Sequence, residues 1–137
     1  MAGYHCHAAV MFADMRGFTG MAERLPPGQV FELLNEFFAL LTGIAVRHQG
    51  TVFNMAGDGL LVGFGAPLAQ ADAPARGLRA ACEALYRFEA LSREWASRHG
   101  VQVGLCIGLS QGEAVVGNVG SPTYMNYTMI GDTVNVA

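Results

Sequence analysis

The sequence predicts an α+β domain of the ferredoxin-like type, in which helices pack on a layer of β-sheet. Short apolar runs bounded by glycine are typical of strands, and two longer segments carry apolar residues at helical spacing. The order along the chain is strand, helix, hairpin, helix, hairpin. With 137 residues, the chain is expected to form one domain over residues 1–137.

The first half of the chain begins with an apolar run, HAAVMFAD at residues 7–14, which predicts a buried strand ending at Asp14. A glycine turn follows, and Thr19 is expected to cap a short helix that runs through Arg24. A longer helix is expected from about Gly28 to His48. Its apolar residues at helical spacing are Val30, Leu33, Leu34, Phe37, Leu41 and Ile44. Phe31, Phe38 and Leu40 widen this stripe, which fits either a deep core helix or a helix that also contacts a partner.

The next two strands are TVFNMA at 51–56 and LLVGFG at 60–65. The tripeptide GDG between them is a strong hairpin signal, because glycine supplies the backbone angles that tight turns need. A second long helix is then expected from an N-cap at Asp72 to His99. Its expected buried face comprises Leu78, Cys82, Leu85, Phe88, Ser92 and Trp95.

The C-terminal part predicts a second hairpin, formed by residues 101–112 and 113–120 and turning at Gln111–Gly112. A short strand, YTMI at 127–130, and a helix start, DTVNVA at 132–137, complete the predicted elements.

Composition restricts the possible functions. The net charge of −3 and the lack of any lysine argue against a nucleic-acid-binding protein, which needs a basic surface. The low charged fraction of 14% indicates that a partner covers some apolar surface. Three widely spaced cysteines predict reduced core thiols in a cytoplasmic domain. No signal peptide or full membrane span is predicted, although a membrane or sensor module could precede the domain in a longer protein.

Asp14 and Asp58 share a local setting, since each follows or links apolar strands and has glycine nearby. Each one alone fits an ordinary turn former. If the first strand lies beside the hairpin, the two carboxylates converge, and such a pair is the usual protein share of a Mg²⁺ site. The N–H groups of Gly17, Phe18 and Thr19 are candidates to bind a phosphate beside it.

Three segments together, FADMRGFT, GTVFNMAGDGLLVGFG and NYTMIGDTVNVA, resemble the catalytic domain of the class III nucleotidyl cyclases, the adenylate and guanylate cyclase family. The resemblance covers nearly the whole chain. It implies a palm-type fold and a head-to-tail homodimer with shared active sites, where ATP is cyclised, and GTP too if selectivity is relaxed. It also implies two Mg²⁺ or Mn²⁺ ions per site, held by Asp14, Asp58 and the carbonyl of Met15.

The resemblance assigns further roles to three polar residues. Asn54 stands where adenylate cyclases have a base-reading lysine, and Thr128 matches its partner, so selectivity between ATP and GTP is left open. Asn54 also fits a polar residue on the solvent face of a strand. Asn135 matches the asparagine that orients the ribose in catalysis, and a helix-capping role is its alternative.

Two hypotheses from different classes remain open. The family's transition-state arginine and a phosphate-binding lysine would follow Ala137, so the domain is expected to be incomplete at its C-terminus. The first hypothesis is an adenylate cyclase with some relaxation toward GTP. The second is an inactive cyclase-like domain that serves as a nucleotide-binding or dimerisation module. Retention of both acids favours the enzyme, because a pure binding module has no need of two unpaired carboxylates in one cleft.

Overall fold

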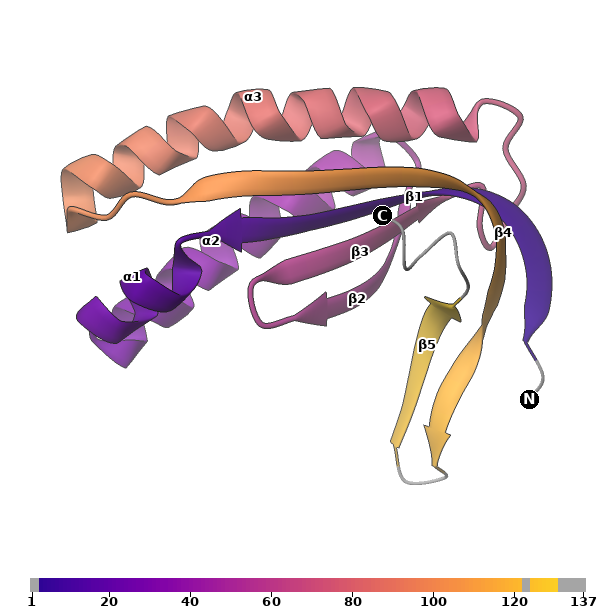
Figure 1. Cartoon of the computed structure of the whole chain (residues 1–137), viewed down its shortest axis with the longest axis horizontal. Helices are drawn as coiled ribbons and strands as arrows, with labels where there is room; N and C mark the ends of the chain where they lie inside the picture. The colour runs from indigo at the N-terminus through magenta and orange to yellow at the C-terminus, as the bar shows by residue number, and fades with distance from the viewer. Residues whose placement is uncertain (1–2, 122–123, 131–137) are drawn as a thin grey trace.

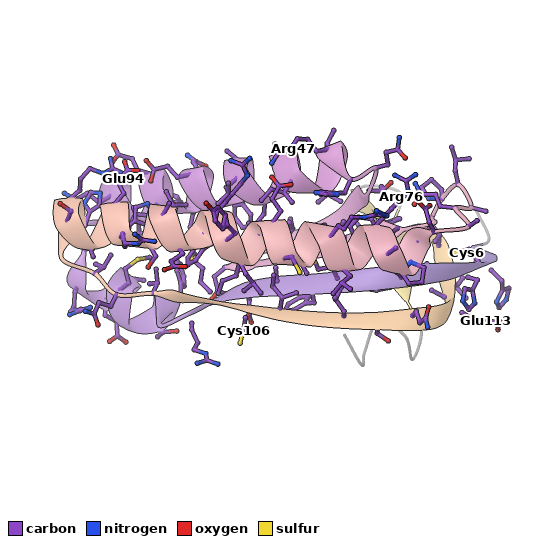
Figure 2. All side chains as sticks on the ribbon, turned by 90° about the horizontal axis from the view of Figure 1, so that it is seen from above. Cys6, Arg47, Arg76, Glu94, Cys106 and Glu113 are labelled. Atoms are coloured by element: carbon purple, nitrogen blue, oxygen red, sulfur yellow. The ribbon has the colours of Figure 1, made fainter. Side chains whose placement is uncertain are left out.

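The structure is a computed structural model that describes residues 3–121 and 124–130. Its described strands form one antiparallel sheet in the order β2-β3-β1-β4-β5. Two long helices lie side by side and cover one face of this sheet (Figures 1 and 2). The strands are β1 (Tyr4–Arg16), β2 (Thr51–Ala56), β3 (Gly59–Phe64), β4 (Gly104–Ser121) and β5 (Tyr124–Ile130). The helices are α1 (Phe18–Arg24), α2 (Pro27–Arg47) and α3 (Ala73–His99). The predicted α+β class is confirmed.

The central strand β1 is longer than predicted, and its residues alternate between the two faces of the sheet. Met11, Ala13 and Met15 are buried in the main core with residues of α2 and α3. By the two-residue period of a strand, Phe12 and Asp14 project to the face that these helices leave uncovered. This alternation places Asp14 on the open face of the sheet.

Helix α2 begins and ends within one residue of the prediction, and its buried side includes most of the expected apolar residues. Phe31, which was expected to widen the stripe, is 67% exposed instead. By length and composition α2 is also apolar enough to cross a membrane. Here it packs on the sheet as part of the main core.

Helix α3 has the predicted bounds, but the prediction of its buried face was partly wrong. Leu78, Cys82 and Leu85 are exposed, and Ser92 is only half-buried, whereas Phe88 and Trp95 are buried as expected. The rest of the buried face is made of small residues, because the helix lies close to its neighbours: a Cβ on Gly77 would lie 3.4 Å from the Phe64 ring. The small residues are Ala73, Gly77, Ala80, Ala81 and Ala84.

The predicted turn at Gln111–Gly112 was wrong. Both residues lie inside β4, a single 18-residue strand, and Gly112 pairs with Ala8 of β1. The ladder to β1 therefore continues through this point, and the chain reverses only between β4 and β5. The strand bends strongly along its length, so that its C-terminal part and β5 lie below the rest of the sheet (Figure 1). As a result β5 contacts β2, although the two strands are at opposite edges.

Two smaller predictions also need correction. The N-cap of α1 is Gly17, with a left-handed φ of 82°, rather than Thr19, which lies inside the helix. None of the three cysteines is fully buried: Cys6 and Cys106 are half-buried and Cys82 is exposed, so they are free thiols but not core residues. The predicted helix start at 132–137 lies outside the described residues.

Candidate active site

Asp14 lies near the end of β1 between two neighbouring strands. It pairs with Gly59 of β3 on one side and with Cys106 of β4 on the other. Gly59 directly follows Asp58, so the strand register places the two aspartates next to each other in space. The convergence that was expected if β1 lay beside the hairpin is thus what the sheet order produces.

A backbone hydrogen bond fixes the hairpin tip against β1. The N–H of Met15 donates to the carbonyl oxygen of Asp58 at 3.2 Å. The preceding residue, Gly57, has a φ of 58°, the left-handed conformation that glycine adopts at low cost. The turn therefore holds Asp58 at the end of β1 without using the aspartate side chain.

The two carboxylates are half-buried and have no hydrogen-bond or ion-pair partner among the described residues. Five other acids contact arginine: Glu36, Asp72, Glu83, Glu89 and Glu94. Two adjacent unpaired carboxylates repel each other unless a cation lies between them. Hard carboxylate oxygens near the end of β1 fit a divalent cation such as Mg²⁺.

The start of α1 adjoins the two aspartates in the chain. Gly17 turns the backbone from β1 into the helix, which begins at Phe18. The carbonyl of Gly17 accepts the N–H of Met21, and no side chain caps the helix start. The N–H groups of the first helical turn have no acceptor within a helix. Those of Phe18 and Thr19 are among them, as the phosphate hypothesis requires.

The remaining predicted site residues lie elsewhere. Asn54 is on β2, opposite Leu61 and just after a bulge. Thr128 is on β5, opposite Gly117. The contact between β2 and β5 brings these two strands together, but the structure describes neither side chain. Asn135 lies outside the described residues.

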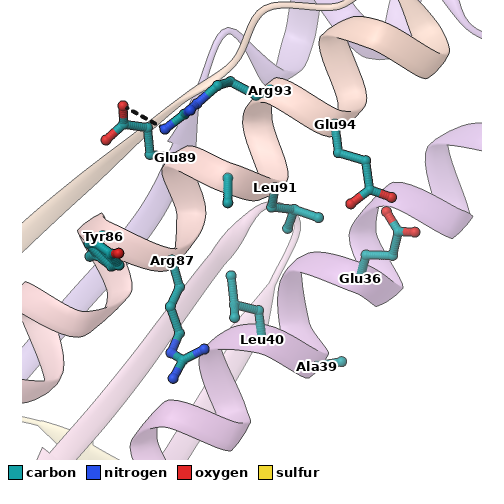
Figure 3. Close-up of a pocket in the computed structure, with 10 residues that line it drawn as sticks. Glu36, Ala39, Leu40, Tyr86, Arg87, Glu89, Leu91, Arg93 and Glu94 are labelled. Atoms are coloured by element: carbon teal, nitrogen blue, oxygen red, sulfur yellow. Dashed lines mark hydrogen bonds and ion pairs between the residues drawn. The ribbon is translucent and has the colours of Figure 1, made fainter.

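A groove of about 590 Å³ lies on the other side of the molecule, between α2 and α3. Figure 3 shows that its sides carry both apolar and charged side chains, among them Leu40, Tyr86, Leu91, Glu36 and Arg93. It contains none of the residues that the sequence predicts for the active site. The groove is therefore separate from the aspartate pair.

One neighbour of the aspartates was not predicted. Cys106 lies directly opposite Asp14, and its Sγ accepts a hydrogen bond from Arg16 Nη2 at 3.6 Å. Figure 2 shows Cys106 projecting from β4 away from α2 and α3. The sequence carried no signal for this contact, since it joins residues 90 positions apart.

Comparison with known proteins agrees with this arrangement. Residues 2–137 match the family described as the adenylate and guanylate cyclase catalytic domain. The adenylyl cyclase CyaB from P. aeruginosa has a similar structure, with a TM-score of 0.94 and 28% identity over 100% of this chain and 71% of its own. The guanylyl cyclase Cya2 is similar with a TM-score of 0.90 and 34% identity, covering 98% of this chain and 68% of its own.

Curated sequences show the same relationship. Adenylate cyclase 1 of Rhizobium meliloti is 32% identical over 99% of this chain, and an uncharacterized protein of Mycobacterium tuberculosis is 38% identical over 100% of it. The chain spans only 20% and 24% of the length of these two relatives. Since the family match extends over almost every residue, the chain belongs to the family of adenylate and guanylate cyclase catalytic domains.

Proposed function

We propose that this domain cyclises a purine nucleoside triphosphate, ATP in the first place, to its 3′,5′-cyclic monophosphate and pyrophosphate. The adjacent, unpaired carboxylates of Asp14 and Asp58 are the observation that carries this proposal. The family match supports nucleotide cyclisation as the chemistry. Both an adenylyl and a guanylyl cyclase are among the similar structures, so relaxed discrimination against GTP belongs to the proposal.

Divalent cations fit the residues present. Asp14, Asp58 and the carbonyl of Met15 would hold two Mg²⁺ or Mn²⁺ ions, since all three offer hard oxygen ligands. No lysine exists in the chain to neutralise the acids instead. Bound divalent ions supply charge stabilisation for the attacking and leaving oxygens of a phosphoryl transfer.

The reaction makes one bond and breaks one. The 3′-oxygen of the ribose attacks the α-phosphorus, and the bond from that phosphorus to the oxygen bridging to the β-phosphorus breaks. Pyrophosphate leaves with the electron pair of that bond, and the proton of the hydroxyl passes to water. The protein aligns the two oxygens, which is the main contribution that positioning makes to phosphoryl transfer.

A second copy of the chain completes the proposed site. The sheet face that carries Asp14 is not covered by the long helices, and Phe12 on the same face is 38% exposed. Ala8 and Val10, earlier in β1 on the same face, are buried in a second core cluster, so the part of the face around Phe12 and Asp14 is the part that fits a dimer interface. In the proposed homodimer, Asp14 and Asp58 of one subunit act with Asn54, Thr128 and Asn135 of the other. The last of these would orient the ribose.

The test measures binding and turnover separately. Calorimetry with Mn²⁺ and 3′-deoxy-ATP, which lacks the attacking hydroxyl, reports binding without reaction. Asp14→Asn and Asp58→Asn should each abolish metal-dependent binding and keep the parental melting temperature, because both residues lie at strand ends and neither side chain makes a described bond. Glu23→Gln on α1 is the matched control, as it removes an exposed acid outside the site.

Turnover is followed as the formation of cyclic AMP from ATP and of cyclic GMP from GTP, both with Mn²⁺. Cyclic product that disappears in both aspartate variants supports the enzyme. Binding without any product would favour the regulatory module instead. Unchanged metal–nucleotide binding in either variant would remove the metal assignment.

A further inference from the structure

The arginines of this chain differ in how they are neutralised. All eight lie in the described part of the chain, and there is no lysine, so they are its only permanently charged side chains of positive sign. Arg16 and Arg24, which flank α1, form no ion pair with a described carboxylate. The other six are within 4 Å of one: Arg47, Arg76, Arg79, Arg87, Arg93 and Arg98.

Arg16 is exposed and belongs to the same face as the candidate site. It is the last residue of β1, two positions after Asp14, so both side chains project to the face that α2 and α3 leave open. Its paired residue on β4 is Gly104, which has no side chain to restrict the position of the Arg16 side chain. The guanidinium thus belongs to the same sheet face as Asp14 and forms no ion pair with either aspartate.

The Arg16 guanidinium makes only a weak hydrogen bond within the described part of the chain. Arg16 Nη2 donates to Cys106 Sγ at 3.6 Å, and a thiol sulfur is a poor hydrogen-bond acceptor. An exposed guanidinium loses little when it leaves such a partner, whereas phosphate oxygens offer two strong charge-assisted hydrogen bonds. The arrangement leaves one exposed positive charge near Asp14 that no described carboxylate neutralises.

We infer that Arg16 binds the polyphosphate chain of the nucleotide, whose oxygens replace Cys106 Sγ as its acceptor. This inference rests on the proposed function and adds a substrate-binding residue to it. Its basis is a fixed positive charge that no described carboxylate neutralises, a weak hydrogen-bond partner, and a position two residues after Asp14 on the same face of the sheet. The same contact would hold the pyrophosphate product.

Arg24 provides the matched control. It also lacks a carboxylate partner, and its Nε donates to the carbonyl of Gly20 in its own helix at 3.4 Å. It is the last residue of α1, at the opposite end from Gly17. A positive charge is favourable there, because the C-terminal end of a helix carries a partial negative charge. Replacing it removes one exposed positive charge from the same helix region without altering the edge of the site.

The experiment measures binding of Mn²⁺ with 3′-deoxy-ATP, inorganic pyrophosphate or AMP to the parent chain and to Arg16→Gln, Arg16→Lys and Arg24→Gln. Arg16→Gln should weaken both polyphosphate ligands by about 10-fold, the usual scale for one charge-assisted hydrogen-bonding pair, and leave AMP within twofold. Arg16→Lys should recover part of the loss, because it keeps the charge but not the planar fork. Arg24→Gln should stay within about twofold of the parent.

Sedimentation velocity on the same samples separates binding from assembly. Parental affinity for pyrophosphate in folded Arg16→Gln would overturn the inference. The inference would also be overturned if Arg16→Gln loses the dimer while the dimers that remain bind pyrophosphate with parental affinity. Arg16 would then be an interface residue. If the parent binds and Asp14→Asn does not, the metal assignment of the proposed function stands whatever Arg16→Gln shows. A parent that binds neither polyphosphate ligand would remove both proposals.

Discussion

Met15 and Asp58 are joined by a hydrogen bond between backbone groups, from N–H to carbonyl, at 3.2 Å. The bond ties the end of β1 to the tip of the β2–β3 hairpin. The relative position of the two candidate metal ligands therefore depends on backbone conformation more than on side-chain packing. A change in the turn should alter metal–nucleotide binding while the core stays intact.

Gly57→Ala tests this dependence. Gly57 has a φ of 58°, and a Cβ built there would meet no atom within 4 Å, so the substitution adds backbone strain without a clash. The cost of the left-handed conformation for alanine is about 1 kcal/mol. We expect a similar loss of unfolding free energy, together with weaker binding of Mn²⁺ and 3′-deoxy-ATP by calorimetry.

Gly100→Ala is the control for Gly57→Ala. Gly100 caps α3 with a φ of 66° and also has open space at the Cβ position. It should lose a comparable amount of stability in urea titrations and keep parental affinity. Equal affinities in the two variants would show that the turn does not position Asp58.

The sequence predicted helix bounds better than the faces and turns. The ends of α2 and α3 carry local signals, a proline in the first turn of each and Gly100 after α3, and both helices match within one residue. The buried face of α3 was predicted only in part: Phe88 and Trp95 are buried as expected, whereas Leu78 and Leu85 are exposed. Close packing of this helix against Phe64 selects small residues there instead.

The site was predicted as far as its chemistry is local in sequence. Asp14 and Asp58 stand beside strand ends and glycines, and they were expected to converge if the first strand lay beside the hairpin, which is the order that the sheet has. The Arg16–Cys106 contact depends on the register of β1 against β4, which the sequence does not encode in any short pattern. The error at Gln111–Gly112 had the same origin, since a glycine was taken as a turn where the strand continues.

A second prediction concerns the packing of α2 on α3. Trp95 is fully buried, and its indole N–H donates to Glu36 Oε2 at 2.6 Å. Trp95→Phe removes this hydrogen bond to a charged acceptor and should cost about 2 kcal/mol of unfolding free energy. Arg98→Gln, which removes the exposed partner of the same carboxylate, should cost much less. Equal losses in urea titrations would contradict a dominant role for the buried bond.

The pH dependence of stability should reflect Glu83. Hydrogen bonds from His48 and Arg47 lower the pKa of this carboxyl from 4.5 to about 2. A carboxyl with a lowered folded-state pKa stabilises the fold above its unfolded pKa, and this stabilisation is lost as the pH falls from 4.5 to about 2. The melting temperature of the parent should therefore exceed that of Glu83→Gln at pH 5, with the difference shrinking toward pH 2.5.

Glu89→Gln serves as the control for Glu83→Gln. Glu89 pairs with Arg93 in an exposed ion pair, whose two side chains are 68% and 75% exposed. Such pairs contribute little to stability, so this variant should follow the parent at every pH. A constant difference between the parent and Glu83→Gln across the range would rule out the predicted linkage.

A fourth prediction tests the shared site of the proposed homodimer. Asp58→Ala and Asn135→Ala should each be inactive, because each homodimer lacks one contribution at both sites. When the two proteins exchange subunits, half of the dimers are mixed and each has one intact site. About a quarter of the parental cyclase activity should return on this basis. Two folded, dimeric variants that exchange subunits and stay inactive would exclude a site shared in this way.

The last prediction concerns base selection at position 54. Asn54 follows a bulge in β2, and β2 contacts β5, the strand that carries Thr128. An amide can donate or accept a hydrogen bond, so Asn54 should discriminate poorly between ATP and GTP. A lysine ammonium only donates hydrogen bonds. Adenine N1 can accept one, whereas guanine N1–H is itself a donor and is left unpaired opposite lysine. Asn54→Lys should therefore raise the preference for ATP in kcat/KM by roughly 10- to 100-fold, or about 1–3 kcal/mol.

Asn54→Gln, which lengthens the side chain but keeps the amide, should leave the ratio near the parental value. If the parent already selects one purine strongly and Asn54→Lys does not change the ratio, position 54 does not contact the base.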